Sequence, residues 1–524
     1  MKSKPYQVFC SSALLPISIG VTIALSACGG GSDLTTVDTV PSSAMLAAAP
    51  NVDRLDVQPA FHRMPLAVAE PSDIDRDGRG MSAYHAPQAV ITPPAFSGLS
   101  TKGLTDELVQ QYLADIQSRG QSPGSGGAVT PAAKPSTSVV YSPAQIRAAY
   151  NLSTLPADTA TAANFGAGQT IYIVDAYSHP NVVKDLNTFS TRFGLPQCTQ
   201  ISVSTASTSL PVAASSSCEI VVIYSTPTGT MTNAAPAYNS GWAQEIALDT
   251  QWAHAIAPLA RIVLIEAASA SLSDLDGSIL LANKLGAGAV SMSFSAAEGS
   301  WVNVSPYSSL FSTTGMSYFA ATGDSGTAVG WPAVHPSVVG VGGTSLSYTS
   351  TGTSTTRSET TWSGTGGGIS KYVPMPSYQT AYTNAGYTIA GEPTSSTKYR
   401  AVGDVSMDAD PHTGVYVAFT ASTASTPSWY AFGGTSLSTP MWAAAVTVAN
   451  ANRAANNYGT LSAPHARLYG TLTSFGNYAS NFYDITSGSN GRCSSCYAST
   501  NYDAPTGLGT PQGGNLITYL SINP

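Results

Sequence analysis

From residue 139 onward, short apolar runs alternate with segments in which apolar residues recur every three or four positions. The short runs predict buried β-strands, and the periodic segments predict amphipathic helices. The expected strands are 170–175, 261–266, 289–294 and 317–322, and the expected helices are 141–150, 241–255, 273–285 and 305–314. This alternation predicts an α/β fold in which helices flank a mostly parallel sheet on both faces.

The preceding residues, 28–138, have a different pattern. Ala- and Pro-rich stretches surround one helix candidate at 105–119, for which Thr105 is a suitable cap. A stretch rich in Gly, Ser and Pro at 120–138 has the composition of a linker. We therefore expect an N-terminal extension of little structure over 28–138, followed by one large domain over 139–524.

Residues 1–27 are patterned as an export signal. Lys2 and Lys4 precede a largely apolar stretch at 11–25. The sequence Leu25-Ser26-Ala27-Cys28 resembles a bacterial lipobox, in which the cysteine becomes the lipidated first residue, and ordinary signal cleavage near Ala27 is the alternative. We expect an exported bacterial protein that is either secreted or held at the cell surface by a lipid anchor on Cys28.

The composition excludes several classes of protein. Charged residues make up 10% of the 524 residues and the net charge is −8, whereas an ordinary soluble protein carries about 25% charged residues. A nucleic-acid partner is not expected, because the chain has neither a basic surplus nor a basic stripe. A hydrophobic content of 43% excludes a chain that is disordered because of its charge.

Four cysteines remain beyond Cys10 and Cys28, which is an even number in an exported chain. Pairing Cys198 with Cys218 and Cys493 with Cys496 is the local solution, one of three connectivities. The second pair could instead form half of a redox or zinc site. A structural bridge is favoured because no second pair of this spacing and no nearby pair of histidines accompanies it.

The sharpest chemical signal is Gly434-Thr435-Ser436-Leu437-Ser438-Thr439-Pro440, which leads into an apolar helix. Ser436 would lie at the start of that helix, where free N–H groups and the helix dipole favour an oxyanion. Serine also caps helices for structural reasons alone. The whole string makes Ser436 a candidate nucleophile.

A serine nucleophile needs a base and a group that orients the base. None of the seven histidines lies in the H-G-T-H setting of a subtilisin, and Asp175 lacks the following glycine of the early subtilisin motif. Glu245 and Asp249 are four residues apart on one predicted helix face, where mutual repulsion raises at least one pKa. An exposed acidic helix face is the alternative.

A third carboxylate, Asp324, lies in Gly323-Asp324-Ser325-Gly326, just after the expected strand 317–322. This is the functional edge of a parallel sheet. A protonated carboxyl group there could donate a hydrogen bond to a developing oxyanion. A turn aspartate is the alternative.

Taken in order, E-x-x-x-D, G-D-S-G and G-T-S-x-S-x-P resemble the motifs of the sedolisin family, the serine-carboxyl peptidases. The resemblance runs from about residue 139 to the C-terminus and implies a subtilisin-like fold. It implies that Ser436 is the nucleophile, Glu245 its general base, Asp249 the residue that orients Glu245, and Asp324 part of the oxyanion hole. His254 also lies in a family motif, and we interpret it as structural.

The resemblance also implies one structural Ca²⁺ site near the C-terminus. Asp484 and Asp503 would supply side chains, and Ile485, Ser499 and Asn501 would supply backbone carbonyls. Family members usually have glycine at the positions of Ser499 and Asn501, so the backbone angles there need to be examined.

We therefore expect a monomeric serine endopeptidase that cuts proteins and peptides through an acyl-enzyme, at acidic pH. The family is normally made as a zymogen with a large folded pro-domain, and residues 28–138 are short and low in strand pattern. Either the prosegment is reduced in this chain or activation works differently. Cleavage within 120–138 would release the enzyme from an anchor. The alternatives are a Ser-His-Asp hydrolase of the subtilisin class and a non-catalytic surface lipoprotein that binds ligands through Ser/Thr/Tyr-rich loops.

Overall fold

The computed structural model describes residues 52, 54–77, 85–119, 136–155, 160–350, 355–393, 396–473 and 477–522. The expected export signal, Cys28 and most of the linker at 120–138 lie outside these residues. All the described residues fall within one compact unit, Asp38–Pro524.

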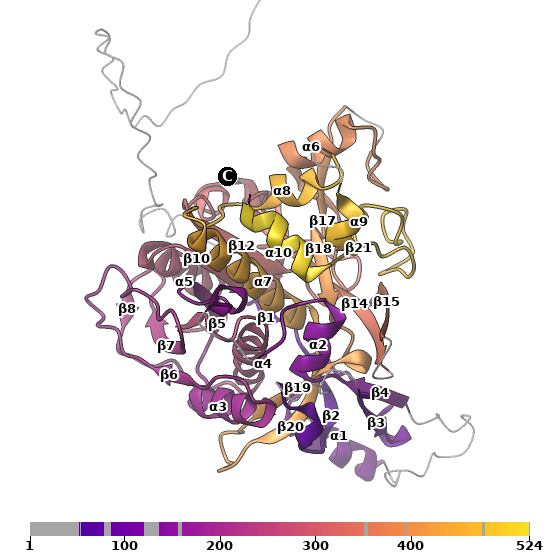
Figure 1. Cartoon of the computed structure of the whole chain (residues 1–524). Helices are drawn as coiled ribbons and strands as arrows, with labels where there is room; N and C mark the ends of the chain where they lie inside the picture. The colour runs from indigo at the N-terminus through magenta and orange to yellow at the C-terminus, as the bar shows by residue number, and fades with distance from the viewer. Residues whose placement is uncertain are drawn as a thin grey trace, which may run out of the picture. The chain divides into compact units, whose positions relative to one another are not determined.

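Ten strands form the central sheet, in the order β15-β14-β12-β10-β5-β9-β7-β6, with β18 beside β14 and β8 beside β7 (Figure 1). The pairings are parallel except where β14 meets β15 and β7 meets β8. The strands are β5 (Thr170–Ala176), β6 (Cys198–Gln200), β7 (Cys218–Ser225), β8 (Met231–Thr232), β9 (Arg261–Ala267), β10 (Gly288–Met292), β12 (Met316–Ala321), β14 (Val338–Ser350), β15 (Thr355–Thr361) and β18 (Val405–Asp408). The mostly parallel sheet predicted from the sequence is confirmed.

Helices cover both faces of this sheet. Side chains along a strand alternate between the faces, so a strand that is apolar throughout has apolar side chains to bury on each face. Along β5, Ile171 and Ile173 join a core with α4 and α7, whereas Tyr172 and Val174 join a second core with α5. The helices are α2 (Pro143–Ala149), α3 (Val182–Phe193), α4 (Ser240–Ile256), α5 (Leu272–Leu285), α6 (Ser377–Asn384), α7 (Thr435–Ala455), α8 (His465–Gly470), α9 (Tyr478–Asn481) and α10 (Gly513–Ile522). Helices α4 and α7, which carry the candidate catalytic residues, pack against each other in the first of these cores.

The predicted helix at 305–314 is wrong. Two short 3-10 helices, η5 (Ser300–Asn303) and η6 (Tyr307–Ser309), lie in this region instead. Pro306 lacks a backbone N–H and interrupts a regular helix. The apolar residues that suggested a helix pack into an aromatic cluster, in which the ring of Phe311 lies 5.2 Å from that of Trp331.

The N-terminal extension contains the expected helix, α1 (Asp106–Ser118), and the Thr105 hydroxyl caps it by accepting the Leu108 N–H at 3.4 Å. It also contains short strands that its residue pattern did not predict. They are β1 (Gln58–Pro59), β2 (His62–Val68) and β3 (Gln88–Thr92), whose partners are β11 (Phe294–Ala297), β20 (Ser428–Gly433) and β4 (Ser136–Val140). Figure 1 shows the indigo strand β2 near β20, which pairs on its other side with β19 (Val415–Phe419). These strands depend on partners far along the chain.

Smaller pairings and two disulfides complete the described structure. The remaining strands are β13 (Gly330–Trp331), β16 (Gly368–Pro374), β17 (Tyr399–Val402), β21 (Phe482–Tyr483) and β22 (Thr510–Pro511). Cys198 is bonded to Cys218, and Cys493 to Cys496, so the local pairing is confirmed. Within the described ranges, no helix combines the length and the apolar character needed to span a bilayer.

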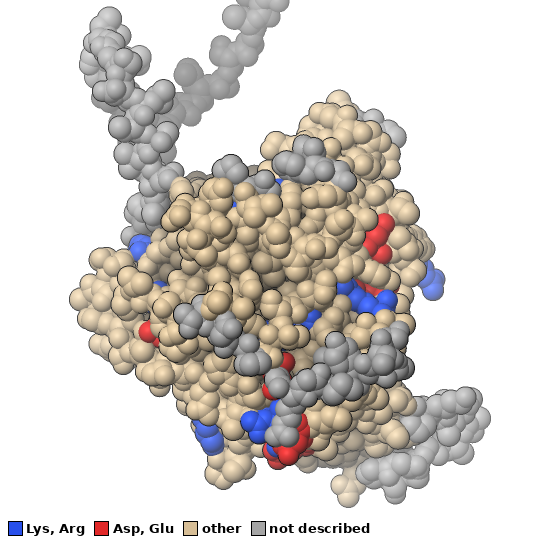
Figure 2. Space-filling model, in the orientation of Figure 1, with Lys and Arg blue, Asp and Glu red and all other residues tan. Residues whose placement is uncertain are grey.

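Charge is sparse on the protein surface that Figure 2 shows. Most of this face is uncharged, and the Lys, Arg, Asp and Glu residues form small separate groups. The face therefore agrees with the low charged content of the sequence and shows no basic stripe.

Candidate active site

Ser436 lies in the first turn of α7, directly after β20 and Gly434. Gly434 has φ +102°, a conformation that a side chain disfavours, and a Cβ there would lie 2.4 Å from the Ala60 carbonyl oxygen and 2.7 Å from Oδ2 of Asp324. The Ser436 side chain is fully buried, and its hydroxyl donates to the Ser293 carbonyl at 3.2 Å. The tight turn thus places a serine hydroxyl and a helix N-terminus at one point.

Helix α4 carries Glu245 and Asp249 into the protein interior beside α7. The helix begins after Asn239, whose side chain accepts the Trp242 N–H at 3.1 Å. Every residue from Trp242 to Ile256 is buried, and Glu245 and Asp249 have no exposed surface. The exposed acidic face considered as an alternative is therefore absent.

Burial and mutual repulsion change the acidity of this carboxylate pair. Burial raises the pKa of Glu245 well above its ordinary value, and the charges of Asp249 and Asp175 raise it further, while the adjacent Ser436 hydroxyl acts in the opposite direction. Burial and then Asp175 likewise raise the pKa of Asp249. The pair can therefore hold a proton at a pH where ordinary carboxylates are ionised. The Ser436 hydroxyl is near enough to Glu245 to influence its pKa, while its own hydrogen bond goes to Ser293.

Asp324 follows β12 and faces the start of α7. Its Oδ1 accepts two hydrogen bonds from Thr435, one from the N–H at 2.9 Å and one from the hydroxyl at 2.7 Å. Burial raises the pKa of Asp324 to about 7, although these bonds act against the rise. The other oxygen, Oδ2, lies 3.5 Å from Nε2 of His62. Below pH 7 the Asp324 carboxyl group is therefore a hydrogen-bond donor beside the Ser436 backbone.

Asp175 also belongs to this cluster, although it was not among the expected site residues. Asp175 is the penultimate residue of β5, is fully buried, and raises the pKa of both Glu245 and Asp249 by its charge. Burial and the charge of Glu266 in turn raise the pKa of Asp175 itself. The signal was present, because an acid at the end of a central parallel strand points to the functional edge, but Asp175 was considered only as a broken subtilisin motif.

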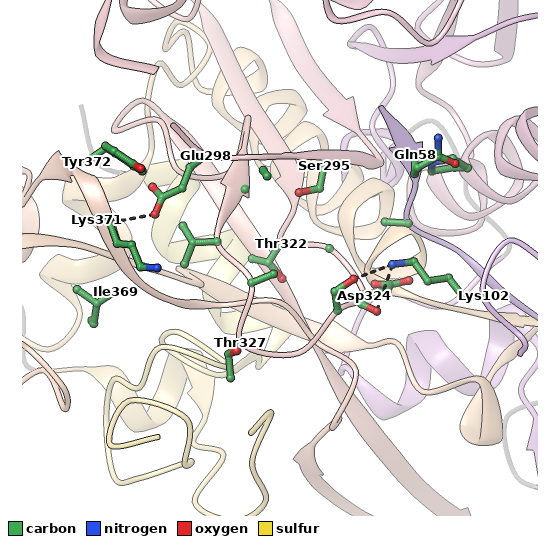
Figure 3. A pocket seen from close by; sticks show the side chains of 18 residues that line it. Gln58, Lys102, Ser295, Glu298, Thr322, Asp324, Thr327, Ile369, Lys371 and Tyr372 are labelled. Carbon is green, nitrogen blue, oxygen red and sulfur yellow. Dashed lines mark hydrogen bonds between the residues drawn. The ribbon is translucent and has the colours of Figure 1, made fainter. Parts of the chain in front are cut away.

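A cavity of about 440 Å³ adjoins Asp324 and is large enough for a side chain of a bound peptide (Figure 3). Ser295 and Ala60 lie along its wall. Glu298, also in the wall, accepts the Lys371 N–H at 2.9 Å and the Ser370 hydroxyl at 2.6 Å, so its carboxylate is held in place.

His254 takes no part in this cluster. It is buried, and its Nε2 hydrogen-bonds to the Pro196 carbonyl at 2.8 Å, beside the disulfide at Cys198. In the part of the chain that the structure describes, no histidine hydrogen-bonds to Ser436. The geometry provides carboxylates, rather than imidazole, as the groups next to the serine.

The candidate calcium ligands come together in a second place, near β21 and the C-terminal loop. Oδ2 of Asp484 accepts the Asn501 N–H at 2.9 Å, and Oδ2 of Asp503 accepts the Ser499 N–H at 3.2 Å. Ile485 is fully buried beside Asp484. The two carboxylates therefore hold the loop that carries the other two candidate carbonyls.

Two observations test whether these residues fit a cation. The Tyr478 hydroxyl lies 3.0–3.2 Å from three oxygens, Asp484 Oδ1, Asn501 O and Leu508 O, yet it has one hydrogen to donate. Asn501 has φ +71°, the left-handed conformation that asparagine tolerates best after glycine. Ser499 is not among the described residues with positive φ. Three oxygens thus surround one hydroxyl beside Asp484, and oxygen atoms are the ligands that a hard cation prefers.

Comparisons with known proteins agree with this geometry. No protein-family model matches the chain. Xanthomonalisin of Xanthomonas sp. is 32% identical over 211 residues (37% of this chain, 22% of the relative). Kumamolisin of Bacillus sp. is 30% identical over 301 residues (53% and 50%), and sedolisin of Pseudomonas sp. is 31% identical over 209 residues (37% and 31%). The chain thus spans between about a fifth and a half of the length of these relatives.

A solved structure shows the same fold. Pseudomonas sedolisin, a serine-carboxyl proteinase complexed with two molecules of pseudo-iodotyrostatin, superposes with a TM-score of 0.55 at 23% identity, covering 74% of this chain and 100% of that one. The chain is therefore similar in sequence to serine-carboxyl peptidases of the sedolisin type and similar in fold to sedolisin.

Proposed function

We propose that this protein is a serine-carboxyl endopeptidase that hydrolyses peptide bonds in proteins and peptides. The observation that carries the proposal is the burial of Ser436, at the start of α7, beside the carboxylate pair of α4 and beside Asp324. A non-catalytic binding protein has no need to bury several carboxylates around one serine, because each buried charge costs stability.

In the proposed reaction, the Ser436 hydroxyl attacks the carbonyl carbon of the substrate and Glu245 takes its proton. Asp249 orients Glu245 and shares the proton that the pair holds. The Ser436 N–H and the protonated Asp324 stabilise the oxyanion. Glu245 then protonates the leaving amine, and water hydrolyses the acyl-enzyme by the reverse route.

The proposed working range is acidic. Asp324 must keep its proton to donate to the oxyanion, and its pKa of about 7 sets the upper limit. The base is a carboxylate pair rather than a histidine, so it can accept a proton well below neutral pH.

A structural Ca²⁺ belongs to the proposal as well. Asp484 and Asp503 would hold it with side-chain oxygens, and Ile485, Ser499 and Asn501 with carbonyls. The cation would neutralise two acidic side chains and fix the C-terminal loop. The loop lies outside the catalytic cluster, so its expected contribution is stability.

Export, the lipid anchor on Cys28, a monomeric state and synthesis as a zymogen also remain proposals. They rest on the N-terminal sequence pattern and the resemblance. Proteins and peptides are the expected partners, and a nucleic acid is not.

The test is hydrolysis of a denatured protein substrate between pH 3 and pH 8 by the full chain and by Ser436→Ala, after both are held at low pH. Acid-dependent hydrolysis that disappears in Ser436→Ala is the expected result. Activity retained by Glu245→Ala would favour a Ser-His-Asp hydrolase. Absence of hydrolysis by a folded protein at every pH would favour a non-catalytic binding protein.

A further inference from the structure

A segment of the N-terminal extension lies against the candidate active site. Residues 57, 59, 60 and 61 are buried, and Val57 and Phe61 have no exposed surface. Gln58, Pro59 and Ala60 also line the cavity next to Asp324 (Figure 3). The structure therefore holds a stretch of its own chain where a substrate peptide would bind.

This segment is held on both sides by backbone pairing. On one side β1 pairs antiparallel with β11, Gln58 opposite Ser295, and the pairing continues with the Ala60 N–H donating to the Ser293 carbonyl at 3.1 Å. On the other side, the Val57 N–H donates to Ala270 O at 2.8 Å and the Leu272 N–H to Leu55 O at 3.0 Å. Pairing of an extended peptide with a strand, as β1 pairs with β11, is a general mode of peptide recognition, because backbone hydrogen bonds form with little dependence on sequence.

The Ala60 carbonyl occupies the place expected for a reacting carbonyl. The Ser436 N–H donates to Ala60 O at 2.9 Å. A Cβ atom on Gly434 would lie within 2.8 Å of three atoms, Ala60 O, Asp324 Oδ2 and the Phe61 Cα, so these three atoms meet at one point. The carbonyl oxygen, the backbone donor and the acidic donor thus converge, which is the arrangement that stabilises an oxyanion.

The downstream side of the segment is anchored differently. Phe61 packs on Phe432, with ring centroids 5.7 Å apart, and β2 continues in antiparallel pairing with β20. His62 lies next to Asp324, and Lys102 donates to Ser325 at 2.8 Å. The chain therefore crosses Ser436 with its Ala60–Phe61 bond fixed from both ends.

We propose that residues 55–61 are a tethered substrate of this protein's own active site, which blocks other substrates and presents the Ala60–Phe61 bond for a first self-cleavage. This inference rests on the proposed peptidase function and adds its regulation. It places the first cut upstream of α1, whereas linker composition pointed to residues 120–138.

The Ser436 hydroxyl turns from Ser293 toward Glu245, and Oγ attacks the Ala60 carbonyl carbon while Glu245 takes the proton. The bond to the Phe61 nitrogen breaks, and Glu245 gives that nitrogen the proton. Water then adds its hydroxyl to the acyl carbon and its proton returns to Ser436, which leaves an Ala60 carboxylate and a Phe61 amine.

Occupation of the cleft can be tested without catalysis, in the full chain carrying Ser436→Ala. Hydrogen exchange followed by mass spectrometry should show slow exchange of the amides at Val57 and Ala60. Val57→Asp places a charge at a fully buried position and should speed their exchange at least tenfold. Val212→Asp is the matched control, since Val212 is 95% exposed, and it should leave the exchange unchanged. Fast exchange in Ser436→Ala itself would overturn the occupation.

The cut itself is tested with active protein by intact-mass measurement and N-terminal sequencing. The first products should end at Ala60 and begin at Phe61, with a rate constant that does not change over a hundredfold range of protein concentration. Activity on an added peptide should rise with this cut, and Val57→Asp should show no lag. Full activity of the wild-type chain while its Ala60–Phe61 bond is still intact would overturn the proposal.

A second variant covers the case in which Val57→Asp does not fold. A disulfide between Gln58→Cys and Ser295→Cys, which face each other across β1 and β11, would lock the segment in place. The cross-linked chain should be inactive until a mild reductant is added. The wild type treated with the same reductant is the control. Full activity of the cross-linked chain would contradict the blocking role. If residues 57–60 are protected and no variant hydrolyses any substrate, the peptidase function itself is wrong.

Discussion

Thr435 binds the Asp324 carboxylate with both its backbone N–H and its hydroxyl, at 2.9 and 2.7 Å, while the next residue is Ser436. The oxyanion acid and the nucleophile are therefore fixed to each other through one residue. Oδ1 of Asp324 is saturated by these bonds, so the proton that the raised pKa retains belongs on Oδ2, which lies beside Gly434, as the Ala60 carbonyl oxygen does.

Thr435→Val should lower kcat about tenfold with little change in KM. The substitution keeps the N–H bond to Asp324 and the side-chain volume. It removes the hydroxyl bond to Asp324 and the acceptor of the Gly323 N–H, a loss of about 1.4 kcal/mol in the positioning of Asp324. Steady-state kinetics on a peptide substrate measure this change. Thr439→Val is the matched control, because its hydroxyl bonds only to the Thr435 carbonyl in the same helix. Equal losses in both variants would show that the effect is structural.

Activity should fall as the pH rises through about 7. Below this pH the Asp324 carboxyl group keeps the proton that it donates, and above it the ionised group repels an oxyanion. Asp324→Asn cannot ionise, so its kcat/KM should be lower by about 10²-fold and should show no such fall. Profiles of kcat/KM from pH 3 to pH 8 measure both effects, and a wild-type rate that increases through pH 7 would contradict this role.

Asp175→Asn should stabilise the fold at neutral pH and have little effect at pH 3. The pKa of Asp175 is raised by burial and by Glu266, so the folded state retains a proton that the unfolded state releases once the pH exceeds its ordinary value. Wild-type stability is therefore lost as the pH rises above that value, and the amide removes this loss. Thermal unfolding in the Ser436→Ala background measures the difference. Asp115→Asn, at an exposed position of α1, is the control for removing one charge.

Calcium should raise the unfolding temperature, and Asp503→Asn should remove this effect. Burial raises the pKa of Asp503 to about 7, and a bound cation would stabilise the ionised form. At a hundred times its Kd, the ion adds about 2.7 kcal/mol to the free energy of unfolding. Scans with calcium, with magnesium and with a chelator test the prediction. Equal curves in all three would show that no calcium binds.

Four strands and three helices of the large domain could be predicted because their signal is local. The apolar run of β5 and the glycine before α7 specify these elements whatever lies around them. Glu245 and Asp249 could be placed on one face of a helix for the same reason, although only the structure shows that this face is buried.

The remaining features depend on contacts that a sequence pattern does not contain. Gln58 and Pro59 form a strand only because Ser295 and Phe294 lie opposite them. Asp175 belongs to the carboxylate cluster because β5 runs beside β9 and ends near α4. Asn501 takes its left-handed conformation in a loop tied to Asp484, which residue identity alone could not establish.

The pairing of β2 with β20 matters for a chain from which the N-terminal extension has been removed. β20 lies between β19 and β2, and its last residue, Gly433, pairs with His62 just before the turn that leads to Ser436. A chain beginning at residue 139 would leave this side of β20 open, with its N–H and C=O groups turned to solvent. Such an open edge can take up a strand from another molecule. Removing the extension would therefore create a place for self-association one residue from the turn that holds the nucleophile.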